Sequence, residues 1–152
     1  MNLTFLDHVG LNVRSLPISF EFYHKVFGFS IFHQWDTTWM IQMGEIKLGL
    51  FQRPQASPVC DLDQKIVISH LAFRTDKDGF NTAQKMLTDL GIPFTPPEYT
   101  GVAYAIFLLD PDGHQVEITT FGPQTNADSA KKNVTLECCG RAARPRVPKT
   151  LI

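Results

Sequence analysis

The stretch Asp110-Pro111-Asp112-Gly113-His114-Gln115-Val116-Glu117 begins with four turn-forming residues and ends in the pattern of a β-strand. Proline fixes one backbone angle, aspartate bonds to nearby backbone, and glycine accepts positive φ, so the first four residues predict a tight turn. An apolar run, Ala105 to Leu109, enters this turn, and the β-type residues Gln115 to Phe121 leave it. The pattern predicts a β-hairpin with Glu117 in its second strand. A carboxylate at such a position needs a positively charged or hydrogen-bonding partner.

The composition indicates one globular domain followed by a basic tail. The chain has 152 residues, of which 43% are hydrophobic and 19% charged, with a formal net charge of -1. Residues 1–122 contain eight Lys/Arg and thirteen Asp/Glu, which gives -5, and residues 123–152 contain six and two, which gives +4. We expect residues 1–122 to bury a core and residues 123–152 to be flexible. The mildly acidic domain gives no reason to expect nucleic-acid binding.

The N-terminus, the lack of a long apolar run and the cysteines predict a cytoplasmic protein. The first residues, Met1 to His8, lack the basic and apolar regions of a signal peptide. No apolar run reaches the ~18 residues that a membrane-spanning helix needs. The three cysteines, Cys60 and the adjacent Cys138 and Cys139, do not form the pattern of a disulfide framework.

The chain contains the same order of elements twice. The periodicity of apolar residues predicts a strand, a helix and three strands in each half. The expected ranges are 6–13, 15–28, 29–34, 38–43 and 45–51, and then 66–75, 76–91, 92–95, 102–109 and 115–121.

The two halves can be placed in phase with one another. His8 precedes Gly28 by twenty residues, and His70 precedes Gly91 by twenty-one. We therefore predict an α+β domain of two βαβββ modules. Module one is residues 4–52, the linker is residues 53–64, and module two is residues 65–122.

Three potential metal ligands share one side of the predicted sheets. Side chains alternate between the two faces of a strand, and the apolar residues of each first strand face the helix. His8 and His70 therefore point to the opposite face, and Glu117 points there too because its neighbours Val116 and Ile118 face the helix. Two imidazoles and one carboxylate suit one divalent ion, namely Fe, Mn, Ni or Zn.

The repeat requires a counterpart of Glu117 in module one. Aligning Leu48-Gly49-Leu50 with Val116-Glu117-Ile118 places Gly49 there, and glycine has no donor atom. A shift of two residues would place Lys47 at this position instead, and a further shift would place Glu45 there. The fourth protein ligand is predicted to be absent on the first alignment.

The chain resembles the vicinal oxygen chelate superfamily, which includes glyoxalase I, fosfomycin-resistance thiol transferases, extradiol dioxygenases and bleomycin-resistance proteins. The resemblance covers residues 4–122. It is carried by Asp7-His8-Val9, by Phe22-Tyr23-His24-Lys25-Val26-Phe27-Gly28-Phe29, by Ser69-His70-Leu71-Ala72-Phe73, and by Asp110 to Ile118. It implies an eight-stranded open cup with the helices outside, commonly as a homodimer, with His8, His70 and Glu117 as metal ligands.

The subfamilies differ in their site residues, and several of these can be compared with this sequence. Glyoxalase I usually has four protein ligands, which Gly49 does not match. Extradiol dioxygenases carry a tyrosine about ten residues before the glutamate, where this chain has Phe107. The fosfomycin-resistance transferases add Lys, Ser and Arg residues that are not recognisable here. The resemblance therefore favours a lyase or isomerase that acts on a small oxygen-chelating substrate through a metal-stabilised enediolate or oxyanion. A ring-cleaving dioxygenase, a thiol transferase and a non-catalytic drug-binding or metabolite-binding dimer are the alternatives.

Further residues are candidates for binding or catalysis, each with a structural alternative. Lys47 and Arg74 could bind an anionic group or form surface ion pairs. Trp35, Trp39 and Tyr99 could contact the substrate or simply pack. Besides Glu117, the carboxylates of Glu45 and Glu98 could serve as acid or base or remain solvated.

Overall fold

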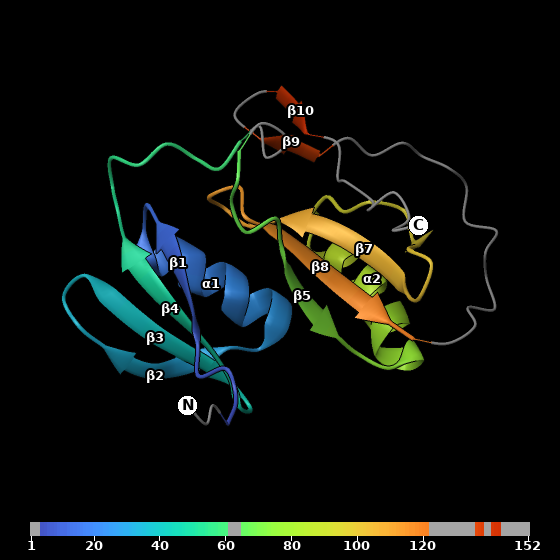
Figure 1. Ribbon diagram of the computed structural model, residues 1–152, viewed down its shortest axis with the longest axis horizontal. Coiled ribbons are helices and arrows are strands. Elements are labelled where there is room, and N and C mark those ends of the chain that lie inside the picture. Colours follow the sequence, from blue (N-terminus) through green and yellow to red (C-terminus); the bar gives the residue numbers. More distant parts are fainter. Residues whose placement is uncertain (1–3, 61–64, 122–135, 139–140, 144–152) are drawn as a thin grey trace. The chain divides into compact units, whose positions relative to one another are not determined.

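The computed structural model describes residues 4–60, 65–121, 136–138 and 141–143. The chain divides into two compact units, Met1–Ser57 and Pro58–Ile152. Each unit contains a four-stranded sheet with both parallel and antiparallel pairs, and one helix (Figure 1). The predicted α+β class and the division into two similar modules are confirmed.

The first unit contains one helix and four strands in the predicted order. Its sheet has the order β1-β4-β3-β2, with β1 parallel to β4 and the other pairs antiparallel. The bounds are β1 Val9–Val13, α1 Leu16–Phe27, β2 Ser30–Gln34, β3 Thr38–Met43 and β4 Ile46–Gln52.

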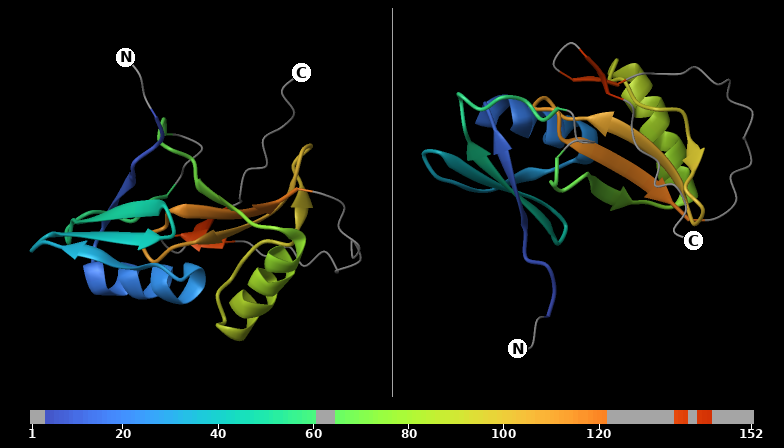
Figure 2. Two further views of the ribbon diagram at one scale, coloured as in Figure 1. Left: turned by 90° about the horizontal axis from the view of Figure 1, so that it is seen from below. Right: turned by 45° about the horizontal axis from the view of Figure 1, so that its top comes forward.

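Helix α1 covers one face of this sheet (Figure 2). Tyr23 and Val26 lie on its buried side, and Leu50 of the contacting strand β4 is buried as well. The helix ends at Gly28, whose φ of 75° few other residues adopt, and the Gly28 N–H donates to the His24 carbonyl. Ser15 stands at the N-cap, but its side chain makes no capping hydrogen bond.

The second unit repeats this arrangement. Its sheet has the order β5-β8-β7-β6, again with a parallel first pair and two antiparallel pairs. The Asp76 side chain caps α2 by accepting a 2.7 Å hydrogen bond from the Gly79 N–H. The bounds are β5 Leu71–Arg74, α2 Lys77–Asp89, β6 Glu98–Tyr99, β7 Tyr104–Leu109 and β8 Gln115–Thr120.

Two strand predictions need correction. The first strand of each unit is shorter than expected, so that His8 and His70 lie immediately before β1 and β5 and not inside them. Residues 92–95 form only an isolated bridge, Phe94 to Leu108, and the edge strand is β6 instead. Pro93 and Pro96 explain this result, because a proline cannot donate a hydrogen bond to a neighbouring strand.

The described part of the basic tail consists of two short strands. β9, Leu136–Cys138, pairs antiparallel with β10, Arg141–Ala143. The other residues of the predicted flexible tail, 123–152, lie outside the described residues.

Cys60 is disulfide-bonded, which the cysteine pattern did not predict. Neither helix of the described chain has the length and apolar character needed to cross a bilayer.

Candidate metal-binding residues

The turn between β7 and β8 determines where Glu117 lies. The buried Asp110 carboxylate accepts hydrogen bonds from the backbone N–H groups of Asp112 at 2.9 Å and His114 at 2.8 Å. Gly113 has a φ of 87°, which few residues other than glycine adopt. These contacts hold the turn tightly, as the sequence predicts, and start β8 at Gln115. Glu117 then pairs with Ala72 of β5 on one side and with Phe107 of β7 on the other.

His70 and Glu117 lie in direct contact. The distance from His70 Nε2 to Glu117 Oε2 is 3.0 Å, and the exposed fractions of the two side chains are 30% and 13%. The Phe107 ring packs edge-on against the imidazole, with 6.0 Å between centroids and 86° between planes. Phe107 is 2% exposed, so the imidazole of His70 packs against a buried aromatic ring.

The separation of the His70 and Glu117 atoms fits a shared cation. Two donor atoms, each about 2.1 Å from one ion and about 90–110° apart, are about 3.0–3.4 Å from each other. The observed 3.0 Å is also the length of a direct hydrogen bond from the imidazole to the carboxylate. Ser69 Oγ lies 2.9 Å from His70 Nδ1, and a hydroxyl can either donate or accept. Ser69 can therefore support the metal-free tautomer and also the tautomer that leaves Nε2 open to a metal.

His8 has a different partner. Its Nδ1 lies 2.7 Å from Asp7 Oδ2, and because an ionised carboxylate only accepts, Nδ1 carries the proton. In the neutral imidazole this leaves the lone pair on Nε2, the state in which an imidazole binds a metal. Lys47 Nζ lies 3.4 Å from the other oxygen of Asp7. The hydrogen bond from His8, and then the contact with Lys47, hold the pKa of Asp7 below its ordinary value.

The structure brings together two of the three predicted ligands. His70 and Glu117 are in contact within the second unit, while His8 belongs to the first unit. Within the described residues of either unit, no three side chains of His, Cys, Asp or Glu form a group that could hold a metal. The set of three ligands stays a prediction, and its donor atoms, two imidazole nitrogens and one carboxylate, suit a divalent ion.

The strand register identifies the counterpart of Glu117. Gly10 stands two residues after His8 and pairs with Gly49, and Ala72 stands two residues after His70 and pairs with Glu117. Gly49 therefore occupies the position in the first sheet that Glu117 occupies in the second. Lys47 and Glu45 do not occupy this position.

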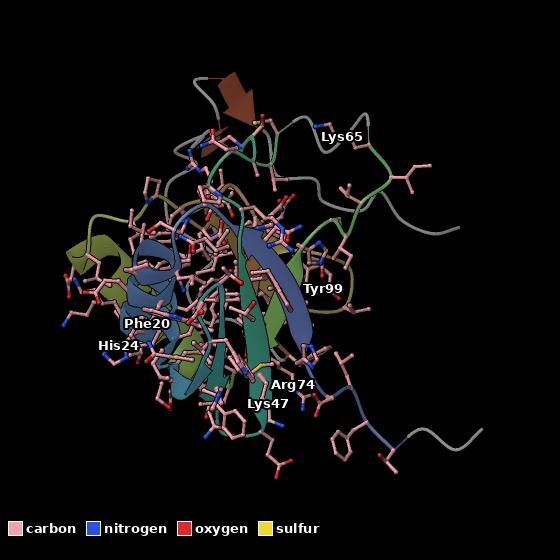
Figure 3. The ribbon with its side chains drawn as sticks, turned by 90° about the vertical axis from the view of Figure 1, so that its left-hand side faces the viewer. Phe20, His24, Lys47, Lys65, Arg74 and Tyr99 are labelled. Atoms are coloured by element: carbon pink, nitrogen blue, oxygen red, sulfur yellow. The ribbon has the colours of Figure 1, made fainter. Side chains whose placement is uncertain are left out.

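The predicted substrate-binding residues come from both units. Lys47 is half-buried and lies 5.4 Å from the centroid of the Phe32 ring. Arg74 is exposed, with its guanidinium 5.8 Å from the centroid of the Phe121 ring. Figure 3 shows Lys47 near the start of β4, and it shows Phe20 and His24 on α1.

The two tryptophans differ in their surroundings. Trp39 meets Phe20 of α1 edge-on, with 5.9 Å between ring centroids, and it pairs with the buried Leu50. It therefore packs on the helical side of the sheet and does not share the face of His8. Trp35 is 52% exposed and lies against the His33 ring, with 4.2 Å between centroids.

The predicted acid–base residues are exposed. Glu45 lies in the turn between β3 and β4, and Glu98 lies in the edge strand β6. Tyr99, beside Glu98, donates a 2.7 Å hydrogen bond from its hydroxyl to the Gly101 carbonyl. Its ring packs on Tyr104 at 5.3 Å between centroids, which accounts for its position without a ligand.

Sequence reasoning gave no role to the residues that contact Nδ1 of the two histidines. Asp7 and Ser69 each immediately precede a histidine, and both can form hydrogen bonds. That shared position is the signal that could have identified them. The contact of Phe107 with His70 depends on strand register, which the sequence did not fix.

Comparison with known proteins agrees with this fold. The model of the glyoxalase/bleomycin resistance protein/dioxygenase superfamily matches residues 5–118. Glutathione transferase FosA of Serratia marcescens is 26% identical over 115 residues, which cover 74% of this chain and 78% of that protein. Glyoxylase I 4 of Arabidopsis thaliana is 29% identical over 130 residues, which cover 78% and 71%. The crystal structure of a glyoxalase/dioxygenase from Nostoc punctiforme superposes with a TM-score of 0.68 at 23% identity, covering 80% of this chain and 94% of that one.

Proposed function

The chain belongs to the glyoxalase/bleomycin resistance protein/dioxygenase superfamily, and we propose that it is a divalent-metal-dependent lyase or isomerase. Its substrate would be a small molecule with two neighbouring oxygen atoms that can chelate the metal. The observation that carries this proposal is the contact of 3.0 Å between His70 Nε2 and Glu117 Oε2. Such a pair, with a hydroxyl at Nδ1 and a buried ring beneath it, suits a metal-binding role.

In this proposal His8, His70 and Glu117 hold the cation. A bound divalent ion would act as a Lewis acid and stabilise negative charge that develops on a substrate oxygen. Asp7 keeps the proton of His8 on Nδ1, and Ser69 orients His70. Lys47, which contacts Asp7, and Arg74 are the residues that we assign to binding an anionic substrate group. Proton transfer is assigned to Glu45 or Glu98, whose exposed carboxylates a bound substrate would have to cover.

Group transfer is the second candidate. A matched relative is named a glutathione transferase, and the proposed ligand set leaves open positions for a substrate. A ring-cleaving dioxygenase is less well supported. The residue paired with Glu117 on the neighbouring strand is Phe107, which lacks the hydroxyl of the tyrosine expected there in extradiol dioxygenases.

A binding protein without turnover is the alternative from another class. Gly49, at the position equivalent to Glu117, leaves the first sheet without a matching donor, which is compatible with ligand binding alone. The homodimer and the cytoplasmic location predicted from the sequence stay predictions.

The test is elemental analysis of protein purified without chelator or affinity tag, followed by titration of the metal-free protein with Fe²⁺, Mn²⁺, Ni²⁺ and Zn²⁺. We expect about one ion per chain, consistent with one three-ligand site. Iron would favour oxygen chemistry, and Ni, Zn or Mn would favour lyase, isomerase or transfer chemistry. A protein that contains no metal and takes none up contradicts the proposal and supports the binding protein.

A further inference from the structure

An aromatic ring lies over a pair of glycines in the first sheet. Gly10 of β1 and Gly49 of β4 are register partners. A Cβ atom added to Gly10 would lie 2.9 Å from Phe51 Cε2, and one added to Gly49 would lie 3.0 Å from the same atom. Carbon atoms in proteins pack at about 3.5–4.0 Å. The Phe51 ring therefore occupies space that is free only because both residues lack a side chain.

This ring lies beside the predicted ligand His8. The Cβ position of Gly49 is 3.7 Å from His8 Cδ2 and 3.4 Å from Phe51 Cζ. The imidazole and the tip of the ring thus border the same point. In the second sheet, the equivalent position carries Glu117, which contacts His70.

Phe51 is only partly buried, so the ring is not enclosed by the core. Its Cδ2, Cε2 and Cζ atoms lie nearest the two glycines, and the part of the side chain that remains accessible is apolar. Met40, the β3 register partner of Gly49, is also partly buried. Phe51 and Met40 are thus the apolar side chains beside the Gly49 position. The register partners of Phe51, which are Asn12 and Thr38, and the Asp7–Lys47 contact are polar.

We propose that Phe51, supported on Gly10 and Gly49, is a specificity-determining residue of the metal site. The ring fills the place beside His8 that a fourth protein ligand would need, and it presents an apolar surface to an aromatic or aliphatic group of the substrate. This inference rests on the proposed function, because the substrate has to be bound at His8 for its apolar group to reach Phe51. It narrows the substrate class to small chelating molecules that carry such a group.

The support of the ring by the glycines can be tested without any ligand. Gly49→Ala should lower the urea midpoint of unfolding more in the wild-type background than in a Phe51→Ala background, because the new methyl group would lie 3.0 Å from Phe51 Cε2 and the ring has to move. An equal loss in both backgrounds would show that the ring does not depend on the glycine, and it would overturn the proposal.

Specificity can be tested with two chelating probes that differ only in one group. Benzohydroxamate and acetohydroxamate each bind a metal through two neighbouring oxygens, and one carries a phenyl ring where the other has a methyl group. We use protein loaded with Zn²⁺, which has no redox chemistry. Wild-type protein should bind benzohydroxamate about tenfold more tightly or better, as burial of much of a phenyl ring predicts. Phe51→Ala should lose most of that preference, while Phe5→Ala, which removes a ring that is 80% exposed, should keep it.

The outcomes separate this inference from the proposed function. Binding of both hydroxamates with the same ratio in wild-type and Phe51→Ala protein would leave the metal site standing and overturn the role of Phe51. Failure of the protein to take up Zn²⁺ would contradict the proposed function itself, and the specificity role would be lost with it.

Discussion

The two units place different side chains at equivalent positions of the same strand pattern. In the second unit, the residue two positions after the histidine is Ala72, and its partner on the neighbouring strand is Glu117, which contacts His70. In the first unit the corresponding partner is Gly49, and the Phe51 ring lies over it, beside His8. Because the register is the same, side chains alone make this difference. One backbone pattern thus supports a pair of polar donors in one unit and an apolar surface in the other.

The histidines also differ in how firmly their protons are placed. The Asp7 carboxylate can only accept, so it holds His8 in one tautomer. The Ser69 hydroxyl can donate or accept, so His70 can change tautomer when the partner of its Nε2 changes. In the proposed metal site, His8 would therefore already have Nε2 available, whereas His70 would first have to leave its contact with Glu117.

The largest expected effect concerns the Phe107 ring, which packs against His70. Phe107→Ala should lower the free energy of unfolding by about 3–5 kcal/mol, because the ring is 2% exposed and its loss leaves a cavity. Met40→Ala, at the equivalent position of the first sheet, should cost clearly less because Met40 is only partly buried. Urea denaturation measures both. Equal losses would mean that the two sheets are packed alike on this face.

The second-largest effect is expected for the carboxylate of Glu117, on the affinity for a divalent metal. Glu117→Gln should weaken metal binding by about 100-fold or more, because loss of a ligand should exceed the 10–100-fold typical of residues that only orient ligands. Titration calorimetry with Zn²⁺ measures this change, and circular dichroism checks that the fold is kept. Glu21→Gln is the matched control, since Glu21 pairs with Lys25 on the surface of α1. Unchanged affinity in Glu117→Gln would remove Glu117 from the ligand set.

The histidine partners give a smaller and graded effect. Asp7→Ala should weaken Zn²⁺ binding by about 10–100-fold, in the range of other residues that orient a ligand. Ser69→Ala should have a smaller effect, because a hydrogen bond to a neutral hydroxyl is weaker than one to a carboxylate. Nitrogen NMR of the metal-free protein should show that His8 loses its single tautomer in Asp7→Ala. A His8 tautomer that does not change would contradict the role of Asp7, whatever the metal affinity.

The helix caps provide the smallest difference. Asp76→Ala should destabilise the second unit by about 1 kcal/mol, because it removes the hydrogen bond to the Gly79 N–H. Ser15→Ala should be nearly neutral, because the Ser15 side chain makes no capping hydrogen bond. Thermal unfolding of both variants tests the comparison, and a cost for Ser15→Ala equal to that for Asp76→Ala would contradict it.

Local patterns predicted some residues well and others poorly. The prediction of the Asp110 turn succeeded because its residues act on their immediate neighbours. The strand expected at residues 92–95 failed because two prolines interrupt its hydrogen bonding. Trp39 was a candidate for substrate contact, but it pairs with Leu50 and packs against Phe20, a position that depends on the partner strand.

The sequence by itself determined the order of elements and the two modules. These features follow from alternation and helical spacing, which act within a few residues. That His8, His70 and Glu117 share one face stays a prediction. Only the tertiary structure decided that Gly49 is the counterpart of Glu117, that Phe107 lies under His70, and that Lys47 contacts Asp7. The physical reason is that register joins strands far apart in the chain, and a shift of two residues would keep every side chain on its face but give it different neighbours.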